Sequence, residues 1–206
     1  MGEAHGGTKD AGENLQGHLR VTFVLTDAAT AEEARDGETL APTELLGAAS
    51  AVRSDVTLRK LGVDRFGVLD RGLERLGEAA VADRLHAAGA AAVVLAGGRN
   101  AAGGLEDLIG VGRRLNTGRA PVRIALVGDR PEDAAAVVAA GAADVALVGD
   151  ADESLPRALE AALRSPADGG EPEAEPRWAG VPGACWQGPT GAQLNGPPAR
   201  PARVQA

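Results

Sequence analysis

Aromatic side chains are scarce in this sequence. Its 206 residues include no tyrosine, two phenylalanines and two tryptophans. A core with so few large rings must be built mainly from alanine, valine and leucine, which lets helices and strands approach each other closely. Layered α/β packing suits such small side chains. The length fits one domain with a single core.

Lysine is almost absent, since Lys9 and Lys60 are the only two. Acidic residues outnumber basic ones by 29 to 21, and the formal net charge at pH 7 is -8. Proteins that bind nucleic acid gather lysine and arginine into clusters that neutralise phosphates. The charge pattern therefore predicts no nucleic-acid partner.

Cys185 is the only cysteine, which excludes an internal disulfide and suits a reducing compartment. Long apolar runs are missing as well, because none approaches the roughly 20 residues that a membrane helix needs. Residues 1–17 are polar and rich in glycine, without the apolar stretch of a secretory signal. We therefore expect a soluble, cytoplasmic protein with no membrane association.

Strand-like and helix-like segments alternate along the chain. Apolar or β-branched runs predict five strands, at residues 19–25, 55–61, 91–95, 122–127 and 144–148. Periodic apolar residues and glycine stops predict five helices, at residues 42–53, 73–88, 105–115, 132–140 and 155–164. We predict a Rossmann-like α/β fold, a flavodoxin-like doubly wound sheet of five parallel strands in the order 2-1-3-4-5, with a C-terminal hairpin extension.

The composition also predicts how the chain is divided. We expect a disordered leader at residues 1–17, an α/β domain at 18–165, a linker rich in proline, glycine and glutamate at 166–177, and a hairpin with a proline-rich tail at 178–206. A lone hairpin buries little apolar surface. We therefore expect the hairpin to be a docking element rather than part of the core.

Three turns containing glycine follow predicted strands, at the edge where open α/β sheets bind ligands. They are Gly97–Gly104, Gly128–Asp129 and Gly149–Asp150. None matches the Gly-x-Gly-x-x-Gly dinucleotide pattern or the Gly-Lys-Ser/Thr of a P-loop. The glycines let backbone approach a flat or phosphorylated ligand, or they are only tight connections. Asp129 is explained equally well as a helix cap, and the acidic residues after Gly149 as partners of a helix macrodipole.

The C-terminal part has an order of motifs that resembles a known family. A strand at 144–148 runs into Gly149-Asp150-Ala151-Asp152-Glu153-Ser154, then a helix, then Trp178-Ala179-Gly180-Val181-Pro182-Gly183 and a proline-rich stretch at 196–201. This order is similar to the end of the cobalamin-binding domain that precedes the catalytic barrel in cobalamin-dependent radical SAM enzymes. The resemblance covers residues 19–201 and implies cobalamin as cofactor, held for methyl transfer or related radical chemistry.

By this resemblance the corrin would lie against the loops after strands one, three, four and five. The cofactor-binding residues that it implies are Thr26, Asp27, Gly97, Gly98, Arg99, Gly128, Asp129, Gly149 and Asp150. The family usually has a second glycine where this chain has Asp129, which puts a negative charge near the expected phosphate of the nucleotide tail. No histidine lies between Asp27 and Pro42, so we expect no protein imidazole on the cobalt.

Radical SAM chemistry needs a Cys-x-x-x-Cys-x-x-Cys run to hold an iron–sulfur cluster, and Cys185 alone cannot hold one. We therefore expect no catalytic or metal-ligating residue here, and a radical SAM barrel protein acting in trans as partner. The alternative is a degenerate module that keeps the fold, binds no corrin and contacts proteins. Asp129 favours it, as does Glu44 at the position of a family glycine.

Overall fold

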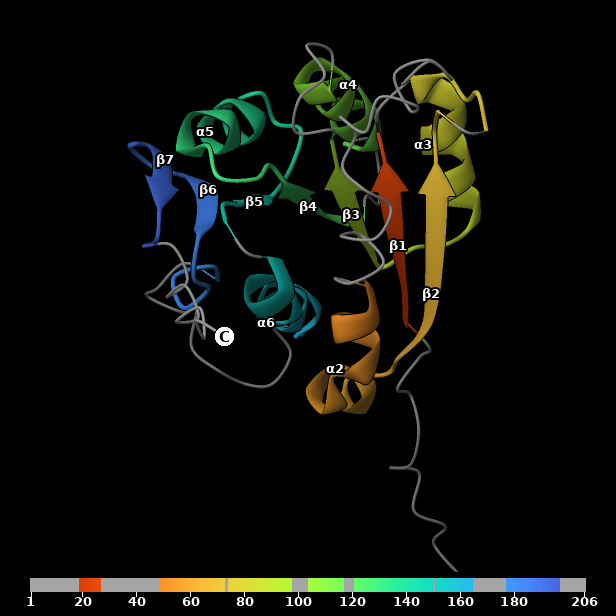
Figure 1. Ribbon diagram of the computed structural model, residues 1–206, viewed down its shortest axis with the longest axis horizontal. Helices are drawn as coiled ribbons and strands as arrows, with labels where there is room; N and C mark the ends of the chain where they lie inside the picture. The colour runs from red at the N-terminus through yellow and green to blue at the C-terminus, as the bar shows by residue number, and fades with distance from the viewer. Residues whose placement is uncertain are drawn as a thin grey trace, which may run out of the picture.

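The computed structural model describes residues 19–26, 49–72, 74–97, 104–116, 121–149, 151–164 and 177–196. These residues form an α/β fold around one mixed sheet of seven strands (Figure 1). The strands are β1 (Leu19–Leu25), β2 (Val63–Asp70), β3 (Ala92–Ala96), β4 (Val122–Leu126), β5 (Val145–Leu147), β6 (Ala184–Gly188) and β7 (Gly191–Leu194). The helices are α2 (Val56–Lys60), α3 (Glu78–Ala87), α4 (Gly104–Leu115), α5 (Pro131–Ala139) and α6 (Ala151–Leu163), and residues 49–54 are also helical.

The strands are arranged in the order β2-β1-β3-β4-β5-β6-β7. Strands β1 to β5 are parallel to one another, whereas β6 and β7 run antiparallel to their neighbours. The sheet thus has seven strands rather than the five predicted, because the C-terminal hairpin pairs with β5. Its antiparallel end makes the sheet mixed and mostly parallel.

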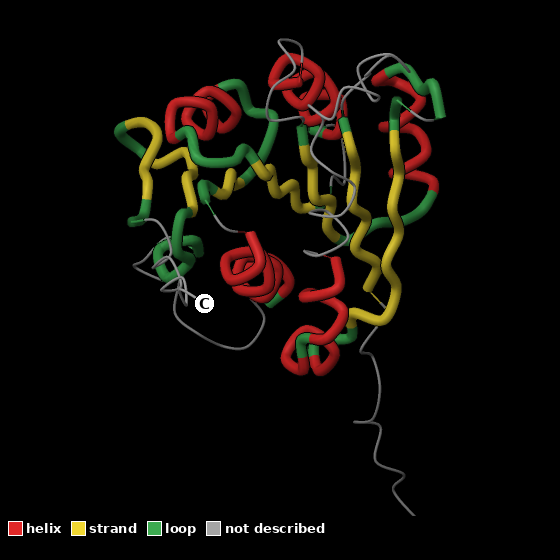
Figure 2. Tube along the Cα trace, in the orientation of Figure 1, coloured by secondary structure: helices red, strands yellow, loops and turns green. Residues whose placement is uncertain are grey.

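Helices cover both faces of the sheet. In Figure 1, α3, α4 and α5 lie on one side and α2 and α6 on the other, and Figure 2 shows the strands between the two groups. Side chains of β1 alternate accordingly: Val21 and Phe23 join the core under α2 and α6, and Val24 joins the core under α3, α4 and α5. Strand β3 is buried on both faces, as its uninterrupted apolar sequence predicted.

The second strand lies further along the chain than predicted. Residues 56–60, expected within a strand, form helix α2. Asp55 caps this helix, since its Oδ1 accepts a hydrogen bond from the backbone N of Leu58 at 2.9 Å. Gly62 then turns the chain into β2 with a φ of 88°. The cap and this turn outweigh the strand preference of Val56 and Thr57.

Two helix boundaries also differ from the prediction. Helix α3 begins at Glu78 rather than near residue 73, because residues 74 and 75 form a turn. Helix α6 begins at Ala151, four residues before the predicted start, so Pro156 lies inside the helix rather than in its first turn. The predicted bounds of α4 and α5 agree with the structure within one residue.

The C-terminal hairpin belongs to the core, so the expectation that it is only a docking element is wrong. Strand β6 pairs with β5, and Trp178, Val181 and Trp186 are buried in the core under α2 and α6. Asn195 fastens the turn before the hairpin, because its Nδ2 lies 2.8 to 2.9 Å from the carbonyl oxygens of residues 178, 179 and 181. The hairpin and the turn therefore complete the sheet and cover one of its faces.

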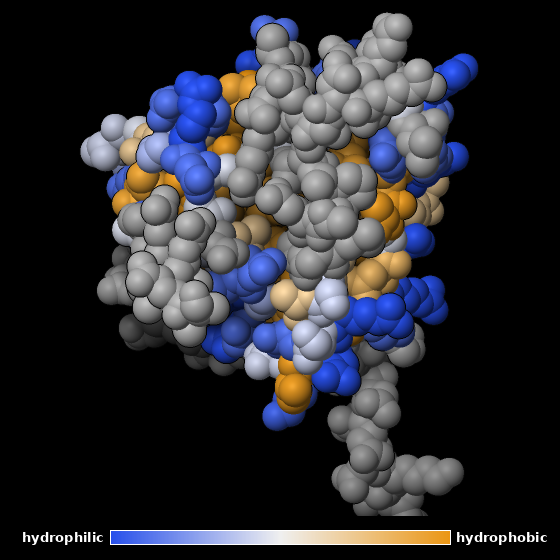
Figure 3. Space-filling view, viewed as in Figure 1, coloured by the Kyte–Doolittle hydropathy of each residue, from blue (hydrophilic) through white to orange (hydrophobic). Residues whose placement is uncertain are grey.

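The predicted leader at 1–17, the predicted linker at 166–177 except for its last residue, and the chain after residue 196 lie outside the described residues. The boundaries of these segments stay predictions. Within the described part of the chain, no helix is long and apolar enough to cross a membrane. Hydrophobic and hydrophilic areas are interspersed on the face drawn in Figure 3. The exposed large hydrophobic residues Val56, Val68 and Leu194 lie on three separate elements.

Candidate ligand-binding site

Four parallel strands end in register at one edge of the sheet. Leu25 is opposite Ala96, Ala96 is opposite Leu126, and Leu126 is opposite Leu147. The residues that follow these strand ends are therefore brought to one edge. This places four sequence-predicted positions, namely Thr26, Gly97, Gly128 and Gly149, along the carboxyl edge of the sheet, which we call the carboxyl-edge site.

Thr26 closes the gap between β1 and β3 at this site. Its backbone N and its Oγ1 donate hydrogen bonds to the carbonyl oxygen of Ala96, at 2.9 and 3.1 Å. The residue is fully buried. Its hydroxyl proton is thus committed to the protein, and Thr26 fixes the two strand ends rather than offering a free donor.

Gly97 lies at a close approach between β3 and α4. A Cβ at this position would come within 2.9 Å of the carbonyl oxygen of Gly104, the first residue of the helix. Packing is therefore a sufficient reason for glycine at this position, which agrees with the alternative that this turn is a tight connection. The same tightness brings the beginning of α4 up to the carboxyl-edge site.

Gly128 and Gly149 form a backbone pair at the ends of β4 and β5. The N–H of Gly149 donates to the carbonyl oxygen of Gly128 at 2.7 Å. Both have positive φ angles, 71° and 89°, in the region where other residues pay a cost of roughly 1–2 kcal/mol. The two turns thus need glycine for their conformation, and the missing side chains leave bare backbone at the edge.

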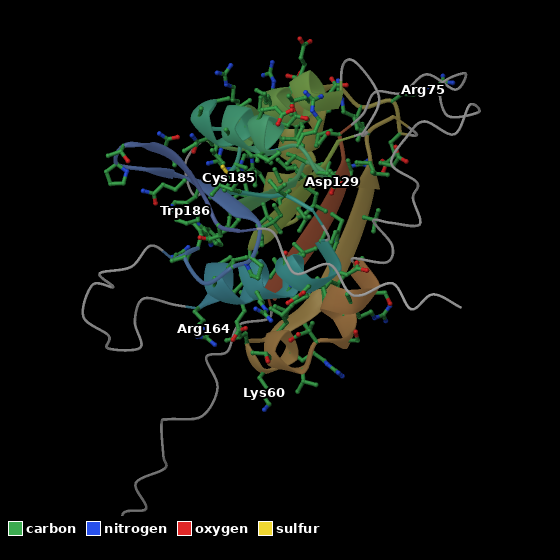
Figure 4. All side chains as sticks on the ribbon, turned by 60° about the vertical axis from the view of Figure 1, so that its left-hand side comes forward. Lys60, Arg75, Asp129, Arg164, Cys185 and Trp186 are labelled. Atoms are coloured by element: carbon green, nitrogen blue, oxygen red, sulfur yellow. The ribbon has the colours of Figure 1, made fainter. Side chains whose placement is uncertain are left out.

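Asp129 follows Gly128 in the turn before α5, and its side chain is exposed. It is labelled in Figure 4. The proposed alternative that it caps this helix is not supported, because Arg130 is the N-cap residue and no side chain makes a capping hydrogen bond. Arg130 donates to Glu132 at 2.9 Å, and this bond raises the pKa of the guanidinium. The pKa of Glu132 is lowered by its own backbone N–H and then by Arg130. Asp129 thus precedes a charge pair in which the cation is already neutralised.

Ser154 is a polar residue in an apolar setting near the carboxyl-edge site. It belongs to the beginning of α6, which follows β5, and it is fully buried. In the described part of the chain its Oγ has no hydrogen-bond partner. Buried polar atoms without partners are uncommon and costly, so this hydroxyl fits the position of a group that meets a ligand or an ordered water.

Arg71 is a basic residue at this edge that the sequence did not point to, because the second strand was placed too early. Its Nη1 donates to the carbonyl oxygen of Thr26 at 3.0 Å and lies 2.5 Å from Oδ1 of Asp107. Its Nε donates to the carbonyl oxygen of Leu76 at 2.9 Å. The largely buried side chain of Arg71 therefore joins the ends of β1 and β2 to helix α4.

The remaining predicted site residues, Asp27, Gly98, Arg99 and Asp150, lie outside the described residues. His86 is exposed on α3. Cys185 is buried in β6, and burial raises the pKa of its thiol. Among the described residues, no group of three or more His, Cys, Asp or Glu side chains is arranged to hold a metal ion.

Comparisons with known proteins relate this fold to cobalamin enzymes. No protein-family model and no curated protein matches the sequence. Among solved structures, the chain is similar to the radical S-adenosylmethionine methyltransferase TsrM from Kitasatospora setae, solved with cobalamin and a 4Fe–4S cluster bound. The TM-score is 0.55 and the identity 14%, over 91% of this chain and 30% of that one.

A second similar structure is the cobalamin-dependent S-adenosylmethionine radical enzyme OxsB, solved with aqua-cobalamin and S-adenosylmethionine bound. The TM-score is 0.52 and the identity 15%, over 89% of this chain and 23% of that one. The chain thus spans less than a third of either enzyme. Likeness at this identity establishes a shared α/β fold, of the kind found in part of these two cobalamin enzymes.

Proposed function

We propose that this chain is a flavodoxin-like cobalamin-binding module, and that the corrin lies on the carboxyl-edge site. The observation that carries the proposal is that two solved structures similar to about nine tenths of this chain both contain cobalamin. The motif order from Gly149 through Gly183 supports the same family. Open α/β sheets also bind ligands at this edge as a rule.

The described residues fit such a group. The turns at Gly128 and Gly149 present backbone without side chains to a flat ligand. Ser154 supplies a buried hydroxyl near this edge, and no described residue is its hydrogen-bond partner. When bound, cobalamin would supply the cobalt chemistry of methyl transfer or a related radical reaction, and this chain would bind and orient it.

The proposed site has no protein imidazole ligand. His86 lies on α3 with its side chain exposed, away from the ends of β4 and β5. The His86→Ala and His18→Ala variants should therefore bind hydroxocobalamin with an unchanged visible spectrum. A spectral shift in either variant would place an imidazole on the cobalt.

Catalysis would require a radical SAM barrel that supplies the cluster cysteines, since this sequence has one cysteine. The chain spans 30% and 23% of TsrM and OxsB. A barrel protein acting in trans is proposed here as the partner. Co-purification of the module with a barrel protein that carries three clustered cysteines would test this part independently of corrin binding.

The binding test is uptake of hydroxocobalamin by the purified chain, followed by gel filtration and absorbance of the protein peak. The proposal predicts coloured protein at one corrin per chain. Asp129→Asn should bind more tightly, because it removes a negative charge near the expected tail phosphate. Glu132→Gln is the matched control, because it makes the same charge change on helix α5. It should bind like the wild type. A colourless wild type would favour the degenerate module that contacts proteins.

The third-strand loop has its own variant. Gly98→Val adds a branched side chain to the loop after β3 and should abolish uptake if that loop faces the corrin. Gly77→Val is its control, because a Cβ at Gly77 has no atom within 4 Å. Equal uptake by the two variants would remove the third-strand loop from the site.

A further inference from the structure

A cavity of about 460 Å³ lies at the opposite edge of the sheet, where β4 and β5 begin. Val122 is the first residue of β4 and Asp144 immediately precedes β5, and both line the cavity. Strand β4 has five residues, so roughly 15 Å of sheet separates this amino-edge cavity from the carboxyl-edge site. The two are therefore distinct places on the molecule, and the volume is in the range of small-molecule pockets.

The two tryptophans of the chain both line this cavity. Trp178 lies in the turn before the hairpin and Trp186 on β6 (Figure 4), and each is 7% exposed. The Nε1 of Trp186 is buried, and in the described part of the chain it has no hydrogen-bond partner. An indole N–H is a donor only, so the group that satisfies it must be an acceptor.

Two arginines line the cavity, and their charges are used differently. Arg123 is buried and pairs with Asp144 at 2.9 Å, so its charge is neutralised within the protein. Arg177 is exposed, and the carbon at the centre of its guanidinium lies 5.8 Å from the ring centroid of Trp178. Within the described residues it forms no ion pair. Among the described residues, the cavity is thus lined by a cation beside an aromatic face and by the tryptophan whose buried indole N–H has no partner.

We propose that the amino-edge cavity binds a small planar carboxylate. The carboxylate accepts hydrogen bonds from the guanidinium of Arg177 and from Nε1 of Trp186, both of which are donors only. The ring of the ligand packs against the indoles, as aromatic pairs do. Asp144 does not repel the ligand strongly, because its charge is paired with Arg123. This site does not depend on whether the chain binds cobalamin.

Intrinsic fluorescence reports on this site directly, since the chain has two tryptophans, both in the cavity wall, and no tyrosine. Benzoate is the probe, and benzamide is its uncharged analogue with the same ring. The proposal predicts a saturable change in tryptophan fluorescence of the full chain with benzoate, and binding of benzamide about tenfold weaker. Excess hydroxocobalamin should leave the benzoate affinity unchanged when it is measured by calorimetry.

Three variants test the assigned contacts by calorimetry. Arg177→Gln should weaken benzoate binding about tenfold and abolish the preference over benzamide. Trp186→Phe keeps an aromatic ring but removes the N–H, and should weaken benzoate severalfold while leaving benzamide less affected. Arg157→Gln changes an exposed arginine on α6 and should bind benzoate like the wild type.

The outcomes that overturn the proposal are specific. They are no saturable response to benzoate, equal affinities for benzoate and benzamide, or equal benzoate affinities of Arg177→Gln and Arg157→Gln. Arg177 is exposed, so its variant should keep the melting temperature of the wild type. With an unchanged melting temperature, weaker benzoate binding by Arg177→Gln reflects a lost contact in the cavity and not a loss of folding.

Discussion

The guanidinium of Arg123 and the carboxylate of Asp144 join the starts of β4 and β5. Nη2 of Arg123 lies 2.9 Å from Oδ1 of Asp144, and Oδ2 accepts the backbone N–H of Arg123 at 2.8 Å. Nη1 donates to the carbonyl oxygens of Gly112 and Gly141, at 3.1 and 2.8 Å. One buried cation thus ties two strands to the ends of α4 and α5.

Replacing Asp144 by alanine should destabilise the fold. The substitution leaves the Arg123 side chain, which is 6% exposed, without its counter-charge. We expect the free energy of unfolding to fall by about 2 kcal/mol, measured by urea denaturation. Glu132→Gln is the control, because Glu132 and its partner Arg130 are both exposed and exposed ion pairs contribute little to stability. Equal losses in the two variants would mean that the buried pair has no special role.

Two glycines on α4 should respond oppositely to alanine. A Cβ at Gly112 would run into the backbone carbonyl of Ala142, which cannot rotate away, whereas a Cβ at Gly110 meets only the side chain of Glu78. Gly112→Ala should therefore lower the free energy of unfolding by about 2 kcal/mol. Gly110→Ala should be neutral or stabilising by up to about 1 kcal/mol, because alanine favours the helix. Urea unfolding of both variants checks this, and a neutral Gly112→Ala would contradict the close approach of α4 to the loop after α5.

Removal of the C-terminal hairpin should unfold the protein. Deletion of residues 177–206 takes two buried tryptophans out of the core and exposes the edge of β5. Deletion of residues 197–206 leaves the hairpin intact and should change the melting temperature little. Thermal unfolding of the two truncations provides the comparison. A stable, cooperative 1–176 fragment would show that the hairpin is dispensable.

Cys185 should make stability depend on alkaline pH. Burial raises the pKa of its thiol in the folded state, so the unfolded chain loses this proton first as the pH rises. The contribution of the Cys185 thiol to the free energy of unfolding is complete below the unfolded-state pKa of about 8.5. It is lost as the pH rises toward the higher folded-state pKa. Between about pH 7 and about pH 10, the free energy of unfolding measured in urea should fall more for the wild type than for Cys185→Ala. Equal losses would mean that the thiol ionises alike in both states.

Local sequence patterns were sufficient for the elements that depend on local chemistry. The uninterrupted apolar run of β3 and the glycine after α5 predicted these elements within about one residue. The second strand was misplaced because Val56 and Thr57 have strand preferences, whereas the cap by Asp55 decides for a helix. A weak preference is easily overridden by one well-placed hydrogen bond.

The sequence alone did not predict pairing between segments that are far apart in the chain. The hairpin was recognised as a hairpin, but its antiparallel pairing with β5 depends on a contact between segments about 40 residues apart. The same holds for the site. Thr26, Gly97, Gly128 and Gly149 were predicted from the edge rule for parallel sheets, whereas Arg71 and Ser154 are distinguished only by their surroundings in the fold.

The most direct test of the central claim is amide hydrogen exchange of the full chain with and without hydroxocobalamin. A corrin on the carboxyl-edge site predicts slower exchange in the segments that follow β3, β4 and β5, around Gly97, Gly128 and Gly149, with little change at the start of β4. Unchanged exchange at these segments, or protection confined to the amino edge of the sheet, would contradict the proposed cobalamin site.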